Sequence, residues 1–130
     1  MKIIQTSGKR KRSVARATLK PGNGTIKINS ALLDHYNNLL ARTRVMEPLI
    51  LAGDASKKVN INVRVKGGGW HSQAEASRLA IAKSLVEVDK KLKKVFLEYD
   101  RHLLIADIRR KEQRKPNDSK ARKSRQTSYR

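Results

Sequence analysis

The residues of this sequence that are best placed to do chemistry are suited to holding phosphate groups. Gly67, Gly68 and Gly69 come directly before a predicted helix. Backbone amides at a helix N-terminus attract anions, and glycines let a phosphate approach them closely. The run lacks the Gly-Lys-Ser/Thr ending of a nucleotide-binding loop and the spacing of a dinucleotide fingerprint. A tight turn without a ligand explains the spacing equally well, but the net charge of +20 favours a phosphate, with Arg78 further along the helix as a helper.

Basic residues gather at the two ends of the chain. No Asp or Glu precedes Asp34, and residues 109–130 hold ten basic residues against two acidic ones. Both runs are rich in arginine, whose planar guanidinium can hold phosphate through two hydrogen bonds, whereas lysine acts as a point charge. A third run, at residues 90–94, is interpreted as solvated surface. The candidate phosphate-binding cations are Lys9, Arg10, Lys11, Arg12, Arg16, Arg109, Arg110, Lys111, Arg114, Lys115, Lys120, Arg122, Lys123 and Arg125.

Side chains for catalysis or metal binding form no recognisable pattern. His35, His71 and His102 are far apart in the sequence, and none has the four-residue spacing of a helical pair of metal ligands. The 11 acidic residues are scattered and no nucleophile motif is present. The sequence therefore predicts a protein that is not an enzyme and that uses no metal, cofactor or small-molecule substrate. The lack of cysteine is compatible with a reducing cytoplasm.

Alternating apolar residues predict the strands that must position these groups. Residues 14–20 and 25–29 are predicted strands, and residues 21–24 (PGNG) are a strong turn signal because Asn and Gly tolerate positive φ. Together they predict a hairpin whose leading basic arm is residues 8–13. Residues 59–66 alternate Val or Ile with Asn, Arg or Lys, which predicts a half-buried strand with a polar and partly basic outer face.

Helices are predicted to cover one face of the sheet. Residues 30–52 form a predicted helix that Pro48 interrupts or restarts and Gly53 closes. Ser72 and Glu75 have the spacing of a capping box, which opens a second helix. That helix runs to about Val88, and the small residues on its inward stripe indicate close approach to the sheet. The stripe consists of Ala74, Ser77, Ile81, Leu85 and Val88.

A last helix is predicted over residues 89–99, with Leu92, Val95 and Phe96 facing inward, and residues 103–108 add a final apolar cluster. The predicted class is therefore α+β, with a mixed or antiparallel sheet covered on one face. Composition allows one modest core, so we expect a single domain over residues 1–108.

Residues 109–130 are predicted to be a basic tail, because they contain no Val, Ile, Leu, Met or Phe. Ordering such a segment costs backbone entropy that burial of two apolar side chains cannot offset. We expect the tail to be disordered alone and ordered on RNA. Fully extended, it reaches roughly 70 Å at about 3.3 Å per residue.

The charge of the whole chain indicates a polyanionic partner. With 31 basic and 11 acidic residues the chain repels itself unless a polyanion supplies negative charge. Membranes fit poorly, since neither a spanning stretch nor a basic amphipathic helix with an aromatic face is present. The few aromatic residues favour recognition of RNA shape and phosphates over base stacking. A DNA-compacting or chaperone protein and a small RNA-processing enzyme are the alternatives, although the enzyme lacks visible catalytic groups.

Five ordered blocks of this sequence resemble the small-subunit ribosomal protein nine family, in its archaeal or eukaryotic form. They are residues 8–17 (GKRKRSVARA), 24–29 (GTIKIN), 65–84 (VKGGGWHSQAEASRLAIAKS), 107–116 (DIRRKEQRKP) and 120–130 (KARKSRQTSYR).

The resemblance implies an α+β domain like the second domain of ribosomal protein five, docked on ribosomal RNA of the small-subunit head beside neighbouring ribosomal proteins. It also implies that the tail runs toward the peptidyl site, where Ser128, Tyr129 and Arg130 approach bound transfer RNA. The bacterial pattern ends in Ser, Lys, Arg, so Tyr129 removes one phosphate-seeking charge from that contact.

Overall fold

A mixed five-stranded sheet forms the scaffold of the protein. The computed structural model describes residues 2–36 and 38–129. The strands lie in the order β1-β2-β5-β3-β4, and all pairings are antiparallel except β3 with β5. Their bounds are β1 (Ile4–Arg10), β2 (Ser13–Pro21), β3 (Ile26–Ile28), β4 (Ala31–Leu32) and β5 (Val59–Lys66).

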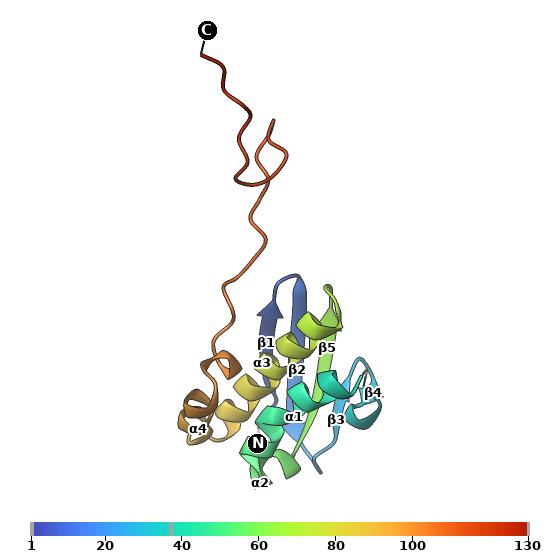
Figure 1. Ribbon diagram of the computed structural model, residues 1–130. Coiled ribbons are helices and arrows are strands. Elements are labelled where there is room, and N and C mark those ends of the chain that lie inside the picture. Colours follow the sequence, from blue (N-terminus) through green and yellow to red (C-terminus); the bar gives the residue numbers. More distant parts are fainter. Residues whose placement is uncertain (1, 37, 130) are drawn as a thin grey trace.

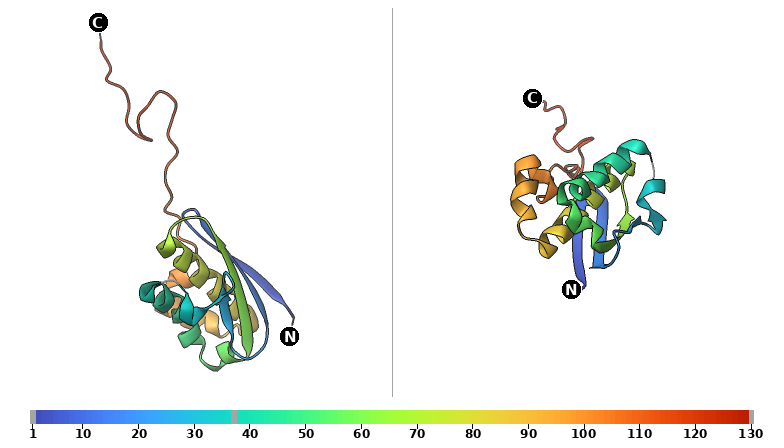
Figure 2. Two further views of the ribbon diagram at one scale, coloured as in Figure 1. Left: turned by 90° about the vertical axis from the view of Figure 1, so that its right-hand side faces the viewer. Right: turned by 90° about the horizontal axis from the view of Figure 1, so that it is seen from below.

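Helices pack on one side of this sheet and leave the other side bare (Figures 1 and 2). The α+β class and the one-sided cover are thus confirmed. The main helices are α1 (Leu39–Ala52), α3 (Trp70–Val88) and α4 (Leu92–Tyr99), with the short turns η1 (Leu33–His35), α2 (Asp54–Lys57) and η2 (Arg101–Leu103) between and after them.

The predicted hairpin was wrong, because β2 pairs with β1 and β5 rather than with β3. The true hairpin joins β1 to β2 through Lys11 and Arg12, and Lys11 adopts a φ of 52° at the turn. The predicted basic arm is therefore the end of β1 and this turn. The segment at residues 21–24 instead carries the chain past the end of β5 to the edge of β5 opposite β2, where β3 pairs. Asn60 Oδ1 holds this segment by accepting hydrogen bonds from Asn23 N and Thr25 N. A central strand with an apolar face needs neighbours on both edges, which local turn signals do not reveal.

The helix predicted over residues 30–52 begins later than expected. Residues 31–35 form β4 and η1, and α1 begins after Asn38, whose side chain accepts a hydrogen bond from Ala41 N. Pro48 does not interrupt α1; it lies within the helix, and its side chain is buried in the protein. Gly53 closes α1 as predicted, with a φ of 52°.

The predicted capping box does not form, because α3 begins at Trp70 after Gly69. Ser72 lies inside the first turn, where its hydroxyl donates to Gly69 O, and Glu75 pairs with arginines instead. The predicted stripe is confirmed at its four buried members, Ala74, Ser77, Ile81 and Leu85. Close approach to the sheet is confirmed as well, because a Cβ at Gly8 of β1 would collide with the Ala76 carbonyl oxygen.

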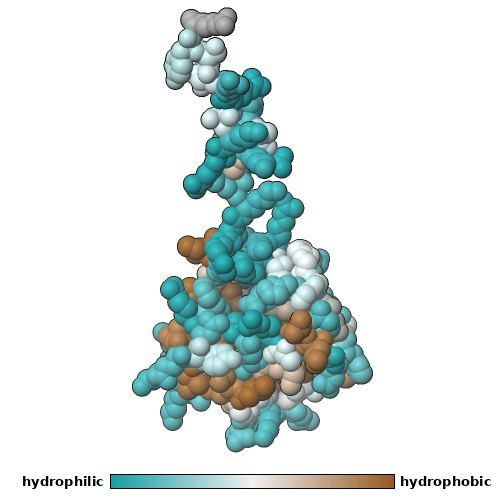
Figure 3. Space-filling view, viewed as in Figure 1, coloured by the Kyte–Doolittle hydropathy of each residue, from teal (hydrophilic) through white to brown (hydrophobic). Residues whose placement is uncertain are grey.

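The last apolar segments are less buried than predicted. Leu92 and Phe96 of α4 are buried, but Val95 is 42% exposed because α4 packs through one narrow face. In residues 103–108 only Leu103 is fully buried, and Ile108 is 90% exposed. Beyond it, residues 109–129 contain no helix or strand and run away from the domain (Figure 1). Figure 3 shows this segment to be hydrophilic along most of its length.

Candidate nucleic-acid interface

The glycine turn between β5 and α3 is built for close packing against the β1–β2 turn. Gly67 and Gly68 have φ values of 79° and 69°. A Cβ at Gly67 would lie 2.6 Å from the Arg12 carbonyl oxygen, and one at Gly68 would collide with Ser13 Oγ. Ser13 Oγ lies 2.7 Å from the Gly67 carbonyl oxygen and 2.8 Å from Ser72 Oγ. The glycines therefore have a structural reason to be there, and they bring the turn beside the basic tip of the hairpin.

Three distant segments meet at this point and enclose an open hollow of about 1370 Å³. Its walls are residues 9–12 of the hairpin tip, 68–72 of the glycine turn and 109–114 of the tail root, and we call it the basic hollow. Its one acidic wall residue is Glu112, whose carboxylate already pairs with Lys115 and Arg122. The structure therefore brings together groups that the sequence placed at opposite ends of the chain.

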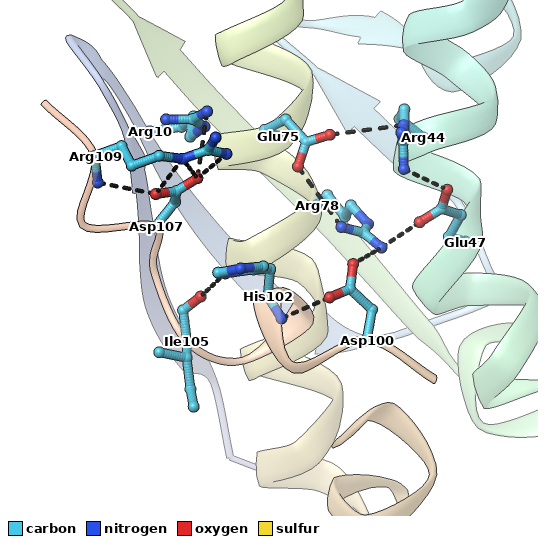
Figure 4. Close-up of polar contacts among 10 residues, drawn as sticks. All are labelled: Arg10, Arg44, Glu47, Glu75, Arg78, Asp100, His102, Ile105, Asp107 and Arg109. Atoms are coloured by element: carbon cyan, nitrogen blue, oxygen red, sulfur yellow. Dashed lines mark hydrogen bonds and ion pairs between the residues drawn. The ribbon is translucent and has the colours of Figure 1, made fainter. Parts of the chain in front are cut away.

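Asp107 fastens the tail root to the hairpin tip (Figure 4). Its Oδ2 atom lies 3.3 Å from Arg10 Nη2 and 2.7 Å from Arg109 Nη2, and its Oδ1 atom accepts from Arg109 N at 2.9 Å. Hydrogen bonds from the Arg109 side chain and amide, with the charge of Arg10, hold the pKa of Asp107 far below its usual range. Asp107 was not among the residues predicted from the sequence; the signal for it is an acid just ahead of the basic run at residues 109–111.

Arg78 does not belong to the interface, which corrects the prediction that it helps the glycine turn hold phosphate. Its side chain is 3% exposed and contacts Glu47 of α1, Glu75 of α3 and Asp100 beyond α4 (Figure 4). The Arg78 Nη2 atom lies 2.9 Å from Asp100 Oδ2. These carboxylates already neutralise the guanidinium. The sequence held a signal, since Arg78 stands four residues after Ala74 and three before Ile81 on the buried stripe.

Asp100 lies at the outer side of this cluster. Burial opposes its ionisation, but hydrogen bonds from the His102 amide and from Arg78 outweigh that effect, and the pKa of Asp100 is lowered. The cluster ties three helical segments together. Its role is structural, since Arg78 is buried and faces carboxylates on three elements.

The remaining predicted cations divide between the basic hollow, the sheet and the tail. Lys9, Lys11 and Arg12 are exposed at the hollow, and Arg10 is half-buried against Asp107. Arg16 lies elsewhere, on the bare face of the sheet. The tail cations from Arg109 to Arg125 are all exposed, and a loop within the tail is held by Arg122 to Glu112 and by Arg125 to the Asn117 carbonyl oxygen.

The basic hollow is not lined by the described end of the tail, and it includes only His71 of the three histidines. Ser128 and Tyr129 are exposed, the latter by 94%, and Arg130 lies outside the described residues. His71 borders the basic hollow beside Trp70, with ring centroids 5.6 Å apart, whereas His35 does not. Among residues 2–36 and 38–129, no group of three or more His, Asp or Glu side chains is arranged to hold a metal ion. None of the helices described is long and apolar enough to cross a membrane.

Comparison with known proteins gives a consistent result. The family described as Ribosomal protein S9/S16 matches residues 8–130. A protein named small ribosomal subunit protein uS9 from Desulfurococcus amylolyticus is 48% identical, over 100% of this chain and 94% of its own length. Proteins of the same name from Methanothrix thermoacetophila and Methanococcus maripaludis are 45% and 46% identical, each over 100% of both chains. On this evidence the chain belongs to the ribosomal protein S9/S16 family.

Proposed function

We propose that the protein is a structural constituent of the small ribosomal subunit, working in the cytoplasmic ribosome rather than as an enzyme. Three relatives at 45–48% identity across the whole chain carry the name of that subunit. The net charge of +20 on 130 residues fits a protein whose cations are neutralised by RNA phosphates.

The ribosomal RNA is proposed to enter the basic hollow. The convergence of hairpin tip, glycine turn and tail root carries this proposal, because it concentrates cations from three segments around one opening. Phosphates there would contact the guanidinium and ammonium groups and approach the exposed backbone of Gly68 and Gly69. Each contact releases condensed counterions from the RNA, so binding falls steeply with salt. Beyond the hollow, the exposed tail cations from Lys115 to Arg125 would follow the backbone between RNA helices.

The tail is proposed to continue toward peptidyl-site transfer RNA in the subunit head, among neighbouring ribosomal proteins. Support comes from the exposed cations of residues 109–125, from the lack of helix or strand in residues 109–129, and from the direction of this segment away from the domain (Figure 1). Ser128, Tyr129 and Arg130 are the residues proposed to reach the transfer RNA. With Tyr129 in this position the terminal contact rests on hydrogen bonding and the last cation rather than on a lysine charge.

Sedimentation with small subunits tests the proposal. The full chain is expected to migrate with subunits through a moderate-salt gradient, and duplex DNA is expected to compete poorly. A variant with Lys11, Arg12 and Arg110 changed to Gln should dissociate at lower salt. A control with Lys58, Lys90 and Lys93 changed to Gln removes equal charge elsewhere and should behave as the parent. Equal loss in both variants, or release by duplex DNA, would argue against a defined RNA site.

The transfer RNA contact needs a separate measurement. Removing residues 128–130 should leave incorporation into subunits unchanged, because Ser128 and Tyr129 are exposed in the tail. It should weaken binding of transfer RNA at the peptidyl site. Unchanged transfer RNA affinity would refute that part of the proposal only.

A further inference from the structure

The bare face of the sheet has the chemistry of a second RNA surface. On β2 and β5 the side chains that point away from the helices include Arg16, Lys20 and Arg64, and Lys27 of β3 joins them. All four are exposed, and none forms an ion pair with any residue that the structure describes. Between them lie polar groups such as Gln5, Thr18 and Asn62, and the face forms a shallow hollow of about 970 Å³.

Acidic residues are excluded from this side of the molecule. Residues 1–33 and 55–74 contain no Asp or Glu, and these ranges hold all five strands. Every acid therefore belongs to a helix, a connection or the tail. On the helical side, three carboxylates balance Arg78. The strands carry no acid that could balance the cations of the sheet face in the same way, so this face is suited to a polyanion.

Register places two of the cations against each other. Arg16 of β2 lies directly opposite Arg64 of β5. Like charges at such a position destabilise a sheet, since opposed Cα atoms are only about 5 Å apart. The next row along the strands joins Gln5, Thr18, Asn62 and Lys27 across four strands, about 6.6 Å away at two residues' rise. Charge and hydrogen-bonding groups thus alternate in rows across the face.

The absence of aromatic side chains from this face decides what kind of RNA it suits. Proteins that read single-stranded RNA on a sheet stack bases on exposed aromatics. The outward side chains of β1, β2, β3 and β5 include none. Double-helical RNA is instead recognised by shape, through phosphates and 2′-hydroxyls across its wide minor groove. Cations flanking Gln, Thr and Asn provide these two kinds of contact.

We propose that the open sheet face, the outward side chains of β1, β2, β3 and β5, docks on a double-helical segment of RNA, separately from the basic hollow. The inference rests on the proposed function, because it assumes that the chain works within an RNA assembly. Arg16 and Arg64 bind phosphates, and Gln5, Thr18 and Asn62 bond the sugar edges. Asn60 is not used in this way, because its Oδ1 atom holds the segment at residues 21–24.

A tethered cleavage probe tests the docking in assembled subunits. The chain contains no cysteine, so Thr18→Cys gives one attachment point for iron-EDTA at the centre of the face. Ser124→Cys gives a second, on the tail. We expect the Thr18→Cys probe to cut both strands of one ribosomal RNA helix. Cuts from the Ser124→Cys probe alone, or cuts from Thr18→Cys confined to single-stranded RNA, would overturn the inference and leave the proposed function intact. Failure of both labelled chains to enter subunits would overturn the proposed function and this inference with it, whereas failure of only the Thr18→Cys chain, still folded by circular dichroism, would support docking through this face.

A charge comparison gives an independent readout on the full-length protein. Arg16→Gln with Arg64→Gln removes two cations from the face, and Lys90→Gln with Lys93→Gln removes two from the helical side. With ribosomal RNA of the small subunit as the probe, the first pair should weaken binding about tenfold or more at about 0.1 M salt. It should also reduce the slope of log affinity against log salt by about 2. The second pair should leave both quantities unchanged. Equal effects of the two pairs would overturn the inference.

Discussion

The Asp107 carboxylate lies 3.3 Å from the Arg10 guanidinium, and this contact joins the start of the tail to the end of β1 across most of the sequence. Asp107 also receives Arg109, so that two cations of the proposed RNA interface are held by a single acid. A carboxylate among phosphate-binding groups would repel RNA if it were free. Here its charge is already matched, and its effect is to set the direction in which the tail leaves the domain.

Replacing Asp107 by Asn should release the tail root without unfolding the domain. The Arg10 and Arg109 ion pairs are lost, and because the side chains of Arg10 and Asp107 are only 15% and 11% exposed, the loss of this partner lowers global stability by about 1 kcal/mol. Hydrogen exchange should therefore become faster at residues 106–112, and the melting temperature should fall by a few degrees. A variant with Asp118, in the tail, changed to Asn serves as the control and should show neither effect. Unchanged exchange in the Asp107 variant would mean that the clamp does not order the tail root.

Replacing Arg78 by Met should destabilise the fold without altering RNA binding at low temperature. The substitution leaves Glu47, Glu75 and Asp100 without their cation, and removal of one partner from a buried cluster costs about 3 kcal/mol. Chemical denaturation measures the loss. Arg101, which is exposed, provides the control: its change to Met should cost less than about 0.5 kcal/mol. If the slope of log RNA affinity against log salt were smaller in the Arg78 variant, Arg78 would have to contact RNA phosphate after all.

Stability should fall as the pH drops below about 4, partly through Asp100. The pKa of Asp100 is lowered in the folded protein, so below its ordinary value of about 3.9 the unfolded chain binds more protons than the folded one. The stability that ionised Asp100 contributes is complete above that pH. It is lost as the pH falls through the pKa of Asp100 in the folded protein. Acid unfolding followed by circular dichroism should show that the free energy of unfolding of Asp100→Asn depends less steeply on pH than that of the parent. Asp54→Asn, at an exposed pair, should change the curve less.

Two glycine substitutions separate backbone strain from steric collision. Gly53 and Gly68 both have positive φ, 52° and 69°, but a Cβ at Gly53 meets nothing within 4 Å, whereas one at Gly68 collides with Ser13 Oγ. Gly53→Ala should therefore cost about 1 to 2 kcal/mol from conformation alone. Gly68→Ala should cost more and should shift the hairpin tip, which amide chemical shifts of residues 9–13 would report. Equal losses of unfolding free energy in the two variants would show that the glycine turn at residues 67–69 moves to accommodate the added Cβ.

The tail should be dispensable for folding. None of the core residues described lies beyond Leu104, so a chain ending at Ile108 loses no apolar packing. We expect the shortened protein to keep its thermal transition within a few degrees and to bind RNA with a smaller salt slope. In the free full-length protein, amides of residues 111–129 should have random-coil shifts that change when RNA is added. An unfolded product would place the domain boundary elsewhere.

The α+β class and most of the helices that cover the sheet could be predicted from the local pattern of apolar residues. The stripe on α3 was readable because its period of about 3.6 residues is set by the helix itself, and the alternation in residues 59–66 was readable because a strand repeats every two residues. The pairing of the strands could not be predicted in the same way. The turn signal at residues 21–24 indicates that the chain changes direction, but it does not indicate which strand pairs with which. β5 takes β2 on one edge and β3 on the other, and that choice depends on burying its apolar face along both edges.

By itself the sequence determined that this chain is a basic protein with one modest core and a polar tail, because net charge and apolar content are properties of composition that no arrangement can alter. Tertiary structure alone decided which cations are free to bind RNA phosphates. Arg78 became a buried partner of three acids, Arg10 was matched by Asp107, and Arg16 was set opposite Arg64 on a face without acids. The physical reason is that the electrostatic role of a charge depends on its distance to other charges and on its exposure to water, and both are fixed only when distant segments pack together.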